Sequence, residues 1–189
     1  MSAVVGLDPS LTAAGIAVIE SPLSASTPNA PSCVSVGSGG SATDTDAETA
    51  IRIRRQAVRV IGTVGKLAPK VSLVVIEGLP RPNPNAPGRH SERCALYWEI
   101  VAELSIRKIP VAVCKPTTLK LFGTGDGKAD KRAMVAAARE LWPHARIHDD
   151  NQADALLLAT AGAYRLRWYE PELPNHIEPR ITWPKGLTK

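Results

Sequence analysis

Two short apolar runs that each end in an acidic residue constrain the fold of this chain more than any other feature. The runs are Ala3 to Asp8 (AVVGLD) and Leu73 to Glu77 (LVVIE). Short continuous apolar runs rich in β-branched residues are typical of central strands covered on both faces. Because neighbouring parallel strands end at the same edge of a sheet, we expect Asp8 and Glu77 to lie together where α/β proteins commonly place their chemistry.

Two further acids lie four residues apart in the segment 149–158, whose sequence is DDNQADALLL. Residues four apart share one helical face, so Asp150 and Asp154 are expected to project together and to repel each other. A divalent metal reverses that penalty, because Mg²⁺ is held by one or two carboxylates together with water and phosphate. Each acid also has a purely structural interpretation: Asp8 precedes Pro9 in a turn, and Asp150 can cap its helix. All four acids in this order favour a metal site over four separate structural roles.

The length and composition fit one soluble domain. We expect that domain at residues 1–168, with an extended, proline-containing tail at 169–189. The net charge of +5 favours a polyanionic partner. No membrane-length apolar stretch or signal-like N-terminus is present, so we expect an intracellular protein. The chain has an odd number of cysteines, and they are widely spaced: Cys33, Cys94 and Cys114. This pattern favours reduced thiols over disulfides.

The remaining apolar patterns predict a sheet with helices between its strands. Thr45 and Glu48 form a plausible capping box for a helix to about Ala68, which carries Ile51, Val58, Ile61 and Val64 at helical spacing. Tyr97 and Trp98, in the next predicted helix, favour packing or subunit contacts over base stacking. The other expected elements are strands at 15–20, around 33–36 and at 110–113, and helices at 91–108 and from Asp130 to about Trp142.

Basic residues in three places are candidate contacts to DNA. Arg52, Arg55 and Arg59 share one side of the first predicted helix, although the pattern favours a solvated basic face over a phosphate contact. Arg81 and Arg89 flank a proline-rich loop after Glu77, which is either functional or a linker.

A glycine turn at 123–127 precedes the helix that starts near Asp130. Lys115 and Lys128 add positive charge around it, and backbone N–H groups at a helix start attract phosphate. An ordinary turn with Asp130 as N-cap is the alternative interpretation. The spacing does not match a Walker loop, which argues against nucleotide hydrolysis of that type.

The order of these motifs resembles the Holliday junction resolvases of the RuvC type, within the retroviral-integrase/ribonuclease H superfamily. The matching segments span residues 3–167: GLDPS at 6–10, GIAV at 15–18, VIE at 75–77, Lys120 before GTG at 123–125, Lys131, and DAL at 154–156. The resemblance implies an α/β, ribonuclease H-like fold with a mixed five-stranded sheet flanked by helices. It also implies a homodimer and Mg²⁺-dependent cutting of four-way DNA junctions in a bacterial or phage-infected cell.

The resemblance places Asp8, Glu77 and Asp154 on metal-binding acids of the family, and Lys120 and Lys131 on lysines near the scissile phosphate. The family often has its fourth acid three residues before the last one, where this chain has Asn151. Asp150, on the same helical face, is preferred over Asp149 for that role.

The segment after Glu77 departs from the bacterial pattern. That pattern carries an aromatic wedge, whereas this sequence has prolines and asparagines. A looser, structure-selective nuclease of the kind found among phage relatives fits this better.

The mechanism that the resemblance suggests is hydrolysis with two Mg²⁺ ions, with Mn²⁺ as the expected substitute. Asp8 would bridge ions roughly 3.5–4 Å apart, with Glu77 on one and Asp150 and Asp154 on the other. Lys120 and Lys131 would offset charge developing on the phosphate, and the product would carry a 5′ phosphate.

Three alternatives use the same residues differently. A ribonuclease H or flap nuclease would need the same acids, and a non-catalytic module could bind branched DNA without cutting it. An actin-like ATPase also begins with a Gly-x-Asp turn, but the chain lacks its later glycine-rich adenosine-binding segment.

Overall fold

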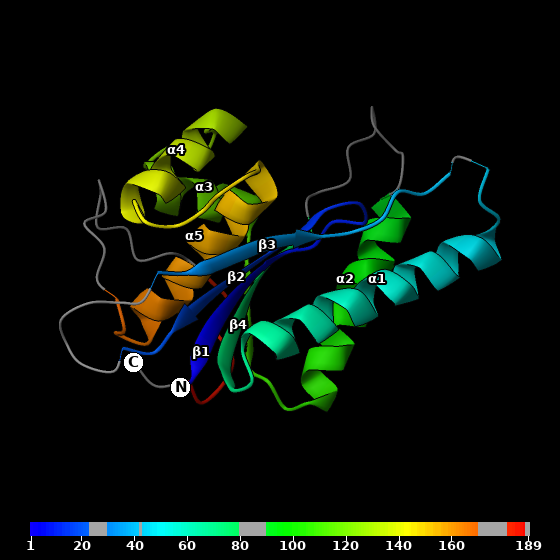
Figure 1. The fold of residues 1–189 in the computed structure, drawn as a ribbon, viewed down its shortest axis with the longest axis horizontal. Helices are drawn as coiled ribbons and strands as arrows, with labels where there is room; N and C mark the ends of the chain where they lie inside the picture. Colours follow the sequence, from blue (N-terminus) through cyan, green and yellow to red (C-terminus); the bar gives the residue numbers. More distant parts are fainter. Residues whose placement is uncertain (23–29, 42, 80–89, 170–180, 188–189) are drawn as a thin grey trace.

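A mixed five-stranded sheet forms the centre of the molecule, as expected (Figure 1). The computed structural model describes residues 1–22, 30–41, 43–79, 90–169 and 181–187. The strand order is β3-β2-β1-β4-β5. The strands are β1 (Ala3–Asp8), β2 (Ala14–Glu20), β3 (Ser32–Val36), β4 (Val71–Glu77) and β5 (Val111–Cys114).

The direction of pairing changes at β1. Strand β1 pairs antiparallel with β2, which pairs antiparallel with β3, whereas β1, β4 and β5 run parallel. Leu7 lies opposite Ile76, so the next residues, Asp8 and Glu77, end their strands at the same edge. All six residues of β1 are buried, which explains its continuous apolar sequence.

Helices cover both faces of the sheet. Figure 1 shows α3 (Pro116–Thr124), α4 (Lys131–Leu141) and α5 (Asp150–Arg165) on one side, and α1 (Asp46–Leu67) and α2 (His90–Ile106) on the other. Alternate residues of β1 pack into the cores on opposite faces of the sheet: Val4 belongs to the core under α5, and Val5 to the core under α1 and α2. Each of the two cores therefore uses one face of the same central strand.

Glycines let α5 lie unusually close to the sheet. A Cβ atom at Gly6 would lie 1.9 Å from the carbonyl oxygen of Ala155, and one at Gly15 would lie 2.0 Å from that of Asn151. No side chain fits at either position without moving the helix. This close approach fixes the first turns of α5 against β1 and β2.

The predicted start of α1 is confirmed, but its buried face differs from the expected one. Thr45 and Glu48 form the reciprocal capping box. Ile61 and Val64 are buried as their spacing predicts, whereas Ile51 and Val58 are 51% and 54% exposed. The helix instead buries residues such as Ile53, Ala57 and Val60, because packing against the sheet and α2 selects a face rotated from the one chosen by apolarity alone.

Three other elements also refine the predictions. Helix α3 was not expected; it begins with Pro116 at its first turn and ends at Gly125, whose φ of 77° is left-handed. Asp130 caps α4 by accepting a hydrogen bond from the amide of Ala133. This is the ordinary N-cap that the sequence allowed as the alternative to a phosphate-binding turn. The tail residue Thr182 exchanges two backbone hydrogen bonds of 3.0 Å with Val113 at the edge of the sheet.

Two expectations about the whole chain can be compared with the described residues. Cys33, Cys94 and Cys114 are free thiols. In the described ranges, no helix is long and apolar enough to cross a membrane.

Candidate active site

Asp8 and Glu77 meet at the ends of β1 and β4 and share a hydrogen bond. Asp8 is only 8% exposed. Burial, reinforced by the charges of Asp8 and Asp154, raises the pKa of Glu77 to about 8. The hydrogen bond between the two carboxyls raises the pKa of Glu77 and lowers that of Asp8, so Glu77 is the partner that holds the proton and donates it to Asp8.

Asp154 brings a third buried carboxyl to the same place from α5. Burial, followed by the charges of Asp8 and Asp150, raises the pKa of Asp154 to about 7. Its Oδ1 atom is buried and has no hydrogen-bond partner among the described residues. Burial also raises the pKa of Asp8 to about 6, against the lowering influence of Arg93. Three acids are thus held where ionisation is costly, a condition that a bound cation relieves.

The two adjacent aspartates at the start of α5 have different partners. Asp149 is the N-cap: its carboxylate accepts hydrogen bonds from the Gln152 amide at 2.8 Å and from the Ser35 hydroxyl at 2.6 Å. Asp150 forms an ion pair with Lys131, which lowers the pKa of Asp150 and raises that of Lys131. The capping role that the sequence allowed for Asp150 therefore belongs to Asp149, and Asp150 faces the other acids.

A hollow of about 450 Å³ opens beside Asp8. Its lining comes from four elements: the end of β1 and the turn after it, the first turn of α2, the first residue of α4 and the start of α5. The lining residues are Asp8, Pro9, Ser10, Leu11, Thr12, Arg93, Lys131, Asp150 and Asn151. Sequence reasoning missed Arg93, because no motif in the sequence points to it.

The predicted cationic residues around this hollow are not equivalent. Lys131 is 82% exposed at the rim, and Lys120 on α3 is near enough for its charge to lower the pKa of Asp154, against the larger effects of burial and of Asp8. Lys115 and Lys128 are exposed and do not line the hollow.

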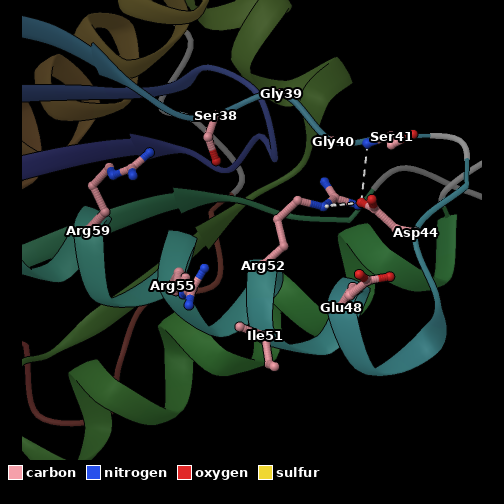
Figure 2. Close-up of a pocket in the computed structure, with 10 residues that line it drawn as sticks. All are labelled: Ser38, Gly39, Gly40, Ser41, Asp44, Glu48, Ile51, Arg52, Arg55 and Arg59. Carbon is pink, nitrogen blue, oxygen red and sulfur yellow. Dashed lines mark hydrogen bonds and ion pairs between the residues drawn. The ribbon is translucent and has the colours of Figure 1, made fainter.

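The arginine stripe of α1 lines a second hollow of about 580 Å³, together with Ser38–Ser41 (Figure 2). Arg52 is not free to bind DNA, because it pairs with Asp44 at 3.3 Å and with Glu92 at 2.6 Å. Arg55 and Arg59 are exposed and form no ion pair with the described residues. The stripe that remains available for phosphate therefore consists of these two arginines.

Arg81 and Arg89 complete the set of predicted DNA contacts. Both lie outside the described residues.

The chemistry of the donor set fits a hard divalent cation. All the candidate ligands are carboxylate oxygens, which suit Mg²⁺ and Mn²⁺, and the buried Asp154 Oδ1 lacks any partner in the described ranges. Over those ranges, however, no group of three or more His, Cys, Asp or Glu side chains is positioned so that it could hold a metal ion. The Glu77 proton and the Asp150–Lys131 ion pair occupy oxygens that a cation would use. Ligation would therefore release a proton and displace Lys131.

Comparison with known families and with curated proteins finds no match. Among solved structures, the chain is similar to RuvC of Thermus thermophilus, with 19% identity and a TM-score of 0.61, over 89% of this chain and 99% of that one. It is also similar to T. thermophilus RuvC in complex with a Holliday junction substrate, with 17% identity and a TM-score of 0.60, over 90% of this chain and 99% of that one. These similarities show a ribonuclease H-like fold and confirm the predicted fold class.

Proposed function

We propose that this protein is a Mg²⁺-dependent, structure-selective DNA endonuclease that resolves four-way and other branched junctions and leaves 5′-phosphate ends. The observation that carries the proposal is the convergence of Asp8, Glu77 and Asp154, three carboxyls with raised pKa values, at one end of the sheet. Two further facts support it: the net charge of +5, and the fold shared with a protein solved on a Holliday junction.

In this proposal Asp8, Glu77, Asp150 and Asp154 hold the divalent cations. Bound cations supply a water of lowered pKa as nucleophile and stabilise the charge on the phosphate and leaving oxygen. Glu77 must lose its proton to become a ligand, so cation binding is favoured by rising pH. Asp149 keeps α5 in place through its hydrogen bonds to Gln152 and Ser35.

Two lysines provide charge for the phosphate. Lys131 is exposed, and its one ion pair among the described residues is with Asp150, so it can turn toward a phosphate once Asp150 takes a cation. Lys120 stays on α3 beside Asp154 and adds positive charge from the same layer of helices. Both would stabilise the negative charge that develops during hydrolysis.

We also propose a homodimer, because resolving a junction requires two symmetric nicks. Its support is an apolar area on α1 and α2. Trp98 is 61% exposed and lines a hollow with Ile53, Ala95 and Ala102, beside the Arg54–Glu99 ion pair. Aromatic residues are enriched at protein interfaces relative to the rest of the surface. The prolines and asparagines after Glu77 favour a phage-like enzyme that selects DNA structure over sequence.

The decisive experiment incubates the purified protein with a labelled four-way junction, a flap, an RNA–DNA hybrid and a linear duplex. Each substrate is tested with Mg²⁺, with Mn²⁺ and with EDTA. We expect paired cuts in the junction that depend on the metal and that ligase can reseal. Asp154→Asn should abolish cutting and retain binding, whereas the exposed Asp46→Asn on α1 should cut normally.

The other outcomes separate the alternatives. Preferential cutting of the hybrid or the flap would assign the same acids to a ribonuclease or flap nuclease. Junction binding without cutting in either metal would identify a binding module and refute the catalytic proposal.

A further inference from the structure

Arg93 is the cationic residue of the hollow that neither the motifs nor the mechanism above uses. It lies in the first turn of α2 and is exposed. It lines the hollow together with Asp8, Lys131 and Asp150. Arg93 belongs to α2 and Lys131 to α4, and these two helices cover opposite faces of the sheet (Figure 1).

The guanidinium of Arg93 has no ion-pair or hydrogen-bond partner in the described part of the chain. Its neighbour Glu92, the acid of the same helical turn, is already paired with Arg52 at 2.6 Å. The Arg52–Glu92 pair therefore leaves Arg93 as the uncompensated charge of that turn.

The charge of Arg93 nevertheless acts on the acids of the site. Burial and the neighbouring carboxylates raise the pKa values of Asp8 and Glu77, and the Arg93 charge opposes both shifts. Arg93 is thus close enough to influence both carboxyls, yet it remains outside ion-pair distance of them. Its five N–H donors are available to a group that enters the hollow.

We propose that Arg93 binds the non-bridging oxygens of the phosphodiester that is cut, from the side opposite Lys131. This inference rests on the proposed function and adds a substrate contact to it. A planar guanidinium suits this role because it can donate two parallel hydrogen bonds to one phosphate. An acid cluster alone repels DNA, and a cation on each side offsets that repulsion where the strand must approach.

The competing interpretation is that Arg93 only balances the charge of Asp8 and Glu77. A counter-ion of that kind would pair directly with a carboxylate, and its loss would destabilise the fold. Arg93 forms no such pair with the described acids, and its exposure weakens any electrostatic contribution to stability. The two roles therefore predict different measurements.

The test compares Arg93→Ala, Arg93→Lys and Arg107→Ala in full-length protein. Arg107 is a matched control, because it is an exposed arginine just past the other end of α2 and, within the described ranges, forms an ion pair with Glu103 alone. Junction affinity is measured with Ca²⁺ in place of Mg²⁺ at several salt concentrations, and single-turnover cutting is measured with Mg²⁺. A second junction carries a neutral methylphosphonate at the mapped cutting site.

We expect Arg93→Ala to weaken junction binding by roughly tenfold to a hundredfold, the range for a hydrogen bond to a charged group. The slope of log affinity against log salt should fall by about 1. The methylphosphonate should weaken binding by the wild type much more than binding by Arg93→Ala. Arg93→Lys should be intermediate, because lysine keeps the positive charge but cannot donate two parallel hydrogen bonds to one phosphate. Arg107→Ala should match the wild type.

Three outcomes would overturn the inference. Unchanged affinity and salt slope in Arg93→Ala, with wild-type cutting intact, would refute the contact and leave the proposed function standing. An equal methylphosphonate penalty in both proteins would place Arg93 on another phosphate. A lower melting temperature without any change in binding would assign Arg93 to charge balance. Failure of the wild type to bind or cut branched DNA would instead refute the proposed function, and this contact with it.

Discussion

Replacing Asp8 with asparagine should stabilise the metal-free protein while destroying its proposed activity. Asp8 has its pKa raised by burial from 3.8 to about 6. Below pH 3.8 the carboxyl is protonated in both the folded and unfolded states and causes no penalty. Between pH 3.8 and about 6 the unfolded chain ionises while the folded protein still holds the proton, so stability is progressively lost, and above that range the full penalty remains. The shift of about two pKa units corresponds to about 3 kcal/mol at pH 8.

Asparagine has nearly the same shape and never ionises at this site. We therefore expect Asp8→Asn to raise the free energy of unfolding by about 1–3 kcal/mol at pH 8, the upper value being the full penalty. The gain should vanish near pH 4. The measurement is urea unfolding in EDTA at both pH values, with the exposed Asp46→Asn as the matched control.

Mg²⁺ provides the second half of the same experiment. A cation at 100 times its dissociation constant stabilises a folded protein by about 2.7 kcal/mol. The wild type should gain stability of this order at pH 8, and Asp8→Asn should gain much less because it has lost a ligand. The reasoning is refuted if Asp8→Asn is less stable than the wild type at pH 8 in EDTA, or if both proteins respond equally to Mg²⁺.

Three further predictions test the scaffold and the protons of the site. Gly6→Ala should leave little folded protein, because its Cβ would lie 1.9 Å from the Ala155 carbonyl oxygen. Gly62→Ala has open space on a helix and should raise the melting temperature slightly. Equal effects of the two substitutions in thermal unfolding would contradict this prediction. Asp149→Ala should lower the free energy of unfolding by about 1 kcal/mol through loss of the N-cap, as measured in urea, and an unchanged midpoint would show that the cap contributes nothing. Single-turnover cutting in Mg²⁺ should rise between pH 6 and 8 as Glu77 loses its proton, and a rate that falls over this range would exclude Glu77 as a metal ligand.

The sequence was sufficient to predict the parts of the fold that depend on local pattern. The runs ending in Asp8 and Glu77 form adjacent parallel strands, and Thr45 and Glu48 form the predicted capping box. These features follow from side-chain type and short-range spacing. Helix α3 was missed because its nine residues begin with proline and end in a glycine turn, so the signals for a loop were stronger than those for a helix.

Features that depend on the partners of a side chain could not be predicted in the same way. Arg52, Arg55 and Arg59 are equivalent in sequence spacing, yet of these three Arg52 alone pairs with acids among the described residues, Asp44 and Glu92. Arg93 belongs to no motif, and it becomes a candidate only because α2 directs it toward Asp8. The sequence shows that such residues are cationic and on which helical face they lie. Tertiary contacts are needed to tell the cations that already pair with an acid from those that can still bind phosphate.

The raised pKa of Asp154 in the candidate site is a consequence of how α5 packs on the sheet. Gly6 and Gly15 have no side chains to hold the helix away, so backbone meets backbone along β1 and β2. That contact buries Asp154 beside Asp8, and burial is the largest cause of the raised pKa of Asp154. Any larger residue at either glycine would break this contact, so the burial that raises the pKa of Asp154 depends on both glycines. The glycines are therefore as much a part of the proposed metal chemistry as the acids are, although they contribute no ligand.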